Sequence, residues 1–86
     1  MKTLYKPAFY RDVEKFPQKI RQIILDFTDL IEKANALTEI PRMRKMEGVD
    51  DIFRIHVTYR YIIFLKWDKE NQMAIVTNAS SREGAY

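Results

Sequence analysis

The sequence contains no cysteine. A chain without cysteine forms no disulfide bond and no thiolate metal site, which excludes the disulfide-stabilised small domains typical of oxidising compartments. Histidine is almost as rare, because His56 is the only one. One imidazole with scattered carboxylates does not match the ligand spacing of familiar zinc sites. We therefore expect a cytoplasmic protein without a metal or other cofactor.

Long hydrophobic segments are also missing. The longest apolar run, YIIFL at 61–65, is far shorter than the roughly 20 residues of a membrane-spanning helix. Met1 leads directly into Lys2 and Thr3, rather than into an apolar stretch of the length found in signal peptides. We expect neither export nor insertion into a membrane.

Glycine and proline are scarce, at two and three residues, whereas hydrophobic residues make up 47% of the chain. Disordered chains carry much less apolar material, so this chain is expected to fold. Its 86 residues fit one hydrophobic core and leave no room for two, which predicts a single domain over 1–86. A net charge of +3 favours anionic partners but is too small to establish nucleic-acid binding by itself.

The first half of the chain predicts a short strand followed by two helices. TLYK at 3–6 has the pattern of a strand, and the segments 8–16 and 18–36, separated by Pro17, repeat apolar residues at helical spacing. The apolar positions are Phe9, Val13 and Phe16 in the first helix and Ile20, Ile23, Ile24, Phe27, Ile31 and Ala34 in the second. Polar residues occupy the rest of the second helix. This pattern indicates an amphipathic helix pair packed by one side against a flat surface.

The second half predicts strands joined by short turns. Segment 37–50 lacks a sustained period and reads as a connection with at most one short strand. Alternation over 51–58 is typical of a strand with one buried and one polar face. Segment 59–67 is continuously apolar in its middle, as a covered central strand would be, and 73–80 predicts a further strand. The fold class is thus α+β, with two N-terminal helices on one face of a small curved, mainly antiparallel sheet.

Basic side chains are predicted to gather on the sheet face that the helices leave open. Arg54 and His56 are two residues apart in a strand, so they share a face. The return of the hairpin brings Arg60 beside them, and the end of the last strand brings Arg82 and Tyr86 to the same region. These five side chains are predicted to form one cationic pocket.

Such a pocket suits the phosphate of RNA. Cleavage of RNA requires activation of a 2′-hydroxyl, neutralisation of the charge on a pentacoordinate phosphorus and protonation of the leaving 5′-oxygen. Arginines match two phosphate oxygens and remain charged. His56, with an ordinary pKa of about 6.5, is the candidate proton-transfer group. Tyr86 would stack on a base or orient the 2′-hydroxyl.

Simpler interpretations exist for each of these residues alone. A single arginine on a strand is most often a solvated charge, and a lone histidine is more often structural than catalytic. The basic residues of the connecting segment, Arg42, Arg44 and Lys45, are either a solvated loop or salt-sensitive contacts to RNA. Only the joint placement of the set favours a function.

The sequence also resembles a known family. MEGVDDIFRIHVTYRYIIF at 46–64, with the closing SREGAY at 81–86, is similar to motifs of the RelE/ParE toxin superfamily of bacterial toxin–antitoxin systems. The order of helix pair and meander matches as well. The resemblance implies a RelE-like fold and the toxin of a type II pair. It implies a metal-independent endoribonuclease (mRNA interferase) that cleaves mRNA in the ribosomal A site and inhibits translation, held inactive by a cognate antitoxin.

The resemblance also assigns roles to residues. It implies phosphate contacts for Arg60 and Arg82, basic strand positions for Arg54 and His56, and the C-terminal aromatic position for Tyr86. The chain departs from the family pattern in having serine at position 81, where the family has histidine. It also has one residue fewer in the hairpin before Arg60.

Two other functions are compatible with the same scaffold. A ParE-like chain would poison DNA gyrase, although that branch lacks the clustered basic set. A non-catalytic module would only bind a partner segment. In the nuclease interpretation the partners are mRNA, the ribosome and an antitoxin, and the toxin alone is expected to be a monomer.

Overall fold

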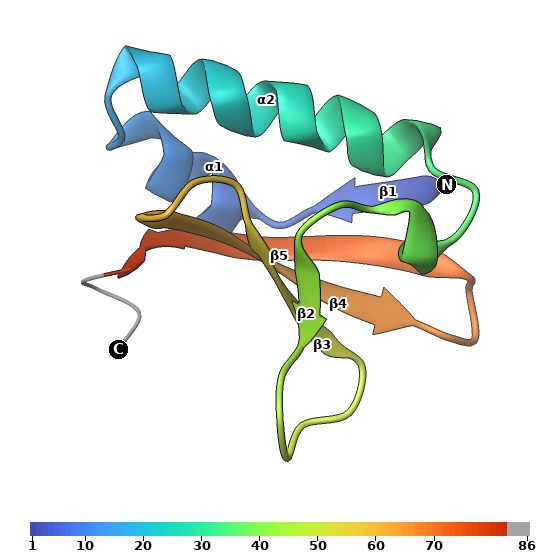
Figure 1. Ribbon diagram of the computed structural model, residues 1–86. Helices are drawn as coiled ribbons and strands as arrows, with labels where there is room; N and C mark the ends of the chain where they lie inside the picture. The colour runs from blue at the N-terminus through green and yellow to red at the C-terminus, as the bar shows by residue number, and fades with distance from the viewer. Residues whose placement is uncertain (83–86) are drawn as a thin grey trace.

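The computed structural model in Figure 1 describes residues 1–82. The elements are β1 (Lys2–Tyr5), α1 (Pro7–Glu14), α2 (Gln18–Lys33), a 3-10 helix (Leu37–Glu39), β2 (Met43–Lys45), β3 (Ile52–His56), β4 (Tyr61–Asp68) and β5 (Met73–Ser81). The α+β class and the order of the elements are confirmed. The second helix is shorter than predicted, because Ala34 already has extended backbone angles.

The five strands form one mixed sheet in the order β1-β5-β4-β3-β2. Strands β2 to β5 pair antiparallel with their neighbours, whereas β1 runs parallel to β5. The chain therefore leaves β1, passes through both helices and the rest of the sheet, and returns beside its own start. This arrangement brings the end of β5 close to the turn between β3 and β4 (Figure 1).

The helices cover one face of the sheet and enclose the core (Figure 1). Ile24 and Ile31 of α2 are fully buried, as are the sheet residues Ile55 and Leu65 facing them. Each such side chain contributes about 1.5–3 kcal/mol relative to an exposed one. The apolar face predicted for the second helix is confirmed. No helix within residues 1–82 is both long enough and apolar enough to cross a membrane.

Strand β4 is covered on both faces. Ile62 and Ile63 are consecutive and both are fully buried, although side chains of neighbouring strand residues point to opposite sides. Ile63 belongs to the core beneath the helices, and Ile62 lies on the other face, paired with His56 and Ser80. The open face of the sheet thus has an apolar base beside its basic residues.

The turn between β3 and β4 is longer than the sequence suggested. Strand β3 ends at His56 and β4 begins at Tyr61, so four residues separate them rather than Thr58 alone. The hydroxyl of Thr58 accepts hydrogen bonds from the backbone N–H groups of Arg60 and Tyr61, each at 3.2 Å. Threonine hydroxyls stabilise turns in this way at the expense of strand pairing, which is why the alternating pattern ran past the end of the strand.

Candidate functional site

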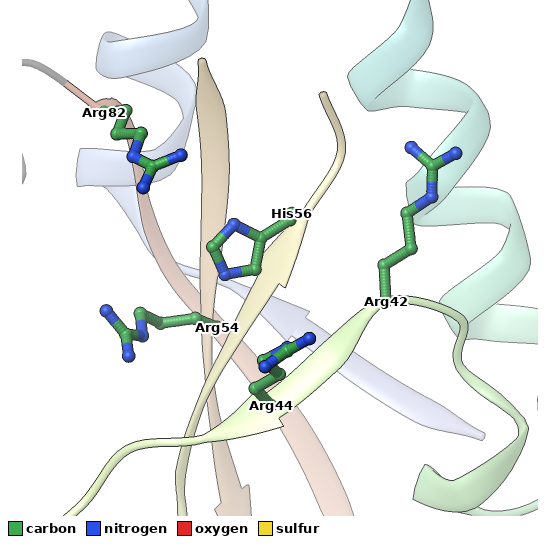
Figure 2. A pocket seen from close by; sticks show the side chains of 5 residues that line it. All are labelled: Arg42, Arg44, Arg54, His56 and Arg82. Carbon is green, nitrogen blue, oxygen red and sulfur yellow. The ribbon is translucent and has the colours of Figure 1, made fainter. Parts of the chain in front are cut away.

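An open pocket of about 490 Å³ lies on the sheet face opposite the helices. Within the described part of the chain it is lined by four arginines and the histidine: Arg42, Arg44, Arg54, His56 and Arg82 (Figure 2). None of these lining residues is acidic. A cavity with this lining attracts anions and repels metal cations.

Strand register places two of the arginines in opposite positions. Arg44 of β2 pairs directly with Arg54 of β3, and His56 lies two residues further along β3 on the same side. Like charges directly opposite each other destabilise an antiparallel sheet. An anion bound near both guanidiniums would reduce this repulsion.

Arg82 reaches the pocket from the end of β5. Its backbone N–H donates to the carbonyl of Arg60, and the adjacent pair Tyr61 and Ser81 continues the β4–β5 ladder. The guanidinium carbon of Arg82 lies 4.6 Å from the centre of the Tyr59 ring. Figure 2 shows Arg82, Arg54 and Arg44 placed around the imidazole of His56. The structure therefore gathers residues that are far apart in the sequence.

The environment of His56 lowers its pKa below the ordinary value of 6.5. Burial is the main cause, and the positive charges of Arg54, Arg44 and Arg82 add to it, because both effects disfavour the imidazolium. The neutral form of the side chain consequently predominates at pH 7. A neutral imidazole accepts a proton, as a general base must.

Arg42 is tied to the turn behind the pocket. Its Nη1 donates a hydrogen bond of 3.2 Å to the carbonyl of Val57, and its own carbonyl accepts the N–H of His56 at 3.2 Å. Its backbone is left-handed, with φ of 60°, which costs a non-glycine residue about 1–2 kcal/mol. Figure 2 shows its guanidinium directed away from the other three. Arg42 thus fixes the backbone that carries His56.

The remaining predicted site residues lie elsewhere. Arg60 is exposed in the β3–β4 turn next to Arg82 but is not among the residues that line the pocket. Lys45 pairs with Phe53 on the helix side of the sheet, and its Nζ lies 3.8 Å from a carboxylate oxygen of Asp50. Tyr86 falls outside the described residues. Within residues 1–82, no group of three or more histidine, aspartate or glutamate side chains is placed to hold a metal ion.

Tyr59, which the structure places beside Arg82, is a residue that the sequence pattern did not indicate as part of the site. The sequence pattern placed Tyr59 at the start of the strand predicted over 59–67, whereas in the structure it lies in the turn that the Thr58 hydroxyl stabilises. Arg44 was noted only as part of a basic connection, since its three-residue strand is too short to be read from a pattern.

Solved structures share this arrangement of helices and sheet. The RelB–RelE antitoxin–toxin complex from Methanococcus jannaschii contains a chain that matches with a TM-score of 0.83 at 22% identity, covering 96% of this chain and 94% of that one. The RelE–RelB complex from Pyrococcus horikoshii matches with a TM-score of 0.74 at 16% identity, covering 94% and 93%. The E. coli DinJ–YafQ toxin–antitoxin complex matches with a TM-score of 0.75 at 11% identity, covering 99% and 96%.

The chain has the RelE-like fold. The expectation from the sequence motifs is confirmed at this level, and the likeness spans nearly the whole of each chain, so one RelE-like unit accounts for both helices and all the strands of the described part. No protein-family model and no curated protein sequence matches the chain. What this RelE-like chain does must follow from the side chains of its pocket.

Proposed function

We propose that this RelE-like chain is the toxin of a type II toxin–antitoxin pair and an endoribonuclease that cleaves mRNA in the ribosomal A site, thereby inhibiting translation. The observation that carries the proposal is the pocket itself. Three guanidiniums surround a neutral imidazole on an open sheet face. These groups supply a base for the 2′-hydroxyl and positive charge for the phosphorus oxygens, two of the three requirements of phosphodiester cleavage.

The chemistry begins at His56. Its neutral imidazole takes the proton of the 2′-hydroxyl, and the 2′-oxygen attacks the adjacent phosphorus while the bond to the 5′-oxygen breaks. The leaving 5′-oxygen takes a proton from solvent. The products are one RNA end with a 2′,3′-cyclic phosphate and another with a 5′-hydroxyl.

The arginines stabilise the charge that develops on the phosphorus oxygens. Arg44 and Arg54 approach the site from β2 and β3, and Arg82 from the residue after β5. Each guanidinium can bind two oxygens at once. Removal of one preorganised donor to a developing oxyanion typically costs about 10²–10³-fold in rate. We expect losses of this order for each of these three arginines. A divalent cation is not part of the proposal, because the same charges repel it.

The other predicted site residues have supporting roles in this proposal. Arg60 and Lys45, both on the surface, add salt-sensitive contacts to ribosomal RNA, and Tyr86 positions the nucleotide. Arg42 acts through the backbone of the turn. Among the described residues that line the pocket, His56 is the single imidazole, and in this proposal the ribosome completes the site around the bound mRNA. The chain acts in the cytoplasm, where mRNA is translated.

An antitoxin partner is supported by the structural relatives, several of which are toxins in complex with RelB or DinJ. We propose that a small protein encoded beside this chain binds it and suppresses its activity. The free toxin is then a monomer, and the inactive form is a heteromeric complex.

Induced expression with mapping of mRNA ends tests the proposal. Cleavage inside codons of translated mRNA is expected for the native chain, and Arg82→Ala is expected to abolish it. Unchanged translation after induction would refute it. Gyrase-linked DNA breaks with intact mRNA would instead favour the ParE-like alternative.

A further inference from the structure

Tyr59 is an exposed aromatic ring at the rim of the pocket. Its exposed fraction is 77%, compared with 55% for Tyr10, the next most exposed large hydrophobic side chain among residues 1–82. A ring so exposed contributes little to the core. Its position is nevertheless specific, because the guanidinium of Arg82, which lines the pocket, lies 4.6 Å from its centre.

The backbone that carries Tyr59 is held from several directions. The N–H groups of Val57 and Thr58 both donate to the carbonyl of Tyr61, at 3.1 and 3.3 Å. The Thr58 hydroxyl accepts two further N–H groups of the turn, and Arg42 binds the carbonyl of Val57 from outside. Figure 1 shows this turn beside the end of β5. The ring is thus presented from an ordered turn.

We propose that Tyr59 is a stacking platform for one unpaired nucleobase beside the phosphate pocket. This inference rests on the proposed function and adds a residue that positions the base. Arg82 connects the two parts, since it lines the phosphate pocket and contacts the tyrosine ring. A phosphate held by Arg82 and a base on Tyr59 then belong to the same or adjacent nucleotides.

Stacking of this kind distinguishes single strands from duplexes. The bases of an RNA duplex are stacked on each other, whereas an unpaired base is free to lie on an aromatic side chain. The guanidinium of Arg82 lies over one face of the ring, so the base is expected to stack on the other face. Base stacking on aromatic rings depends little on sequence, so Tyr59 is expected to select strandedness rather than a particular codon.

Binding of uncleavable RNA tests the platform. The full chain is titrated into two short fluorescent 2′-O-methyl single strands, one with bases and one abasic, and anisotropy reports the affinity. For Tyr59→Leu we expect about ten-fold weaker binding of the strand with bases and unchanged binding of the abasic strand. Tyr59→Phe is expected to bind both like the native chain, because it keeps the ring. Tyr10→Leu, which removes an exposed tyrosine from α1, is the matched control.

Equal weakening of both strands by Tyr59→Leu would overturn the proposal, because the ring would then only support Arg82. Unchanged binding of both strands would overturn it as well. Nuclear magnetic resonance of the native chain gives an independent test, with the Tyr59 ring protons expected to shift on addition of the strand with bases but not of the abasic strand. Tyr59 ring protons that do not shift with the strand with bases, or that shift equally with both strands, would contradict the platform. This test needs no variant.

Cleavage of translated mRNA, measured in parallel, separates this inference from the proposed function. A native chain that binds bases through Tyr59 yet leaves mRNA intact would refute the nuclease and keep the platform. If Tyr59→Leu cleaves mRNA as well as the native chain and binds both strands with unchanged affinity, the platform is refuted and the nuclease stands.

Discussion

At the scale of single residues, the protonation state of His56 is set by its neighbours. An exposed histidine would be partly charged at neutral pH, but burial and three guanidiniums hold the pKa of His56 below its ordinary value. The neutral form is the one that accepts a proton from a hydroxyl. The same arginines thus bind the phosphate and set the state of the base.

The lowered pKa makes folding stability depend on pH. Because the folded pKa lies below the unfolded value, the unfolded chain binds more protons in the window between them, and stability rises with pH there. As the pH falls from neutrality through about 6.5, the native chain should lose stability relative to His56→Gln. Urea unfolding of both chains across this window measures the difference. A stability difference that grows in favour of the native chain on acidification would contradict the lowered pKa.

The facing pair Arg44 and Arg54 predicts stabilisation by phosphate. Removing one charge with Arg44→Gln relieves repulsion, so in chloride the variant should match the native chain or exceed its stability by up to about 1 kcal/mol. Phosphate should raise the melting temperature of the native chain more than that of the variant. Lys45→Gln, which removes an equal charge on the other side of the sheet, is the control and should respond to phosphate like the native chain. Identical phosphate responses of all three would show that no anion binds between the arginines.

At the scale of elements, the β3–β4 turn and the edge strand β2 hold the site together. Arg42 joins them through its hydrogen bond to Val57 and its carbonyl contact with His56. Its left-handed backbone is a local cost that the surrounding contacts sustain.

Two substitutions of Arg42 separate its side-chain bond from its backbone strain. Arg42→Ala loses the hydrogen bond and keeps a Cβ at positive φ, so it should destabilise the fold by about 1 kcal/mol. Arg42→Gly loses the same bond but adopts this φ without penalty. We therefore expect the glycine variant to be the more stable of the two in chemical unfolding. An alanine variant more stable than the glycine variant would show that position 42 is not left-handed.

The sequence predicted those elements whose pattern is local. The apolar stripe of α2 and the alternation of Phe53 to Val57 needed only the helical and strand periods. The local pattern could not predict the parallel pairing of β1 with β5 or the register of Arg44 against Arg54, because both depend on contacts between segments that are distant in the sequence. The turn at Thr58 was misread, since its side-chain hydrogen bonds compete with the strand pattern. Arg82 lines the pocket, as the strand predicted over 73–80 indicated.

At the scale of the whole molecule, the two faces of the sheet have different roles. One face packs on the helices and supplies the stability, whereas the other carries the basic pocket (Figures 1 and 2). The net charge is only +3, so the pocket concentrates positive charge that the overall balance does not reveal.

This concentration predicts which charges govern the salt dependence of RNA binding. For a single strand, each phosphate contact contributes about −0.7 to the slope of log affinity against log salt. Arg54→Gln should reduce the slope by about this amount, because Arg54 lines the pocket. Lys19→Gln, on the solvent side of α2, should leave it unchanged. Equal slopes for the native chain and Arg54→Gln in fluorescence titrations would place the bound RNA outside the pocket.

The most direct test is the chemistry of the cut ends. Purified chain is added to ribosomes carrying a defined mRNA, and the RNA ends are analysed for the native chain and His56→Gln. The native chain should leave a 2′,3′-cyclic phosphate and a 5′-hydroxyl, at a rate that His56→Gln reduces by about 10²–10⁴-fold. Intact mRNA, or cleavage by His56→Gln at the native rate, would contradict the assignment of the basic pocket as the active site.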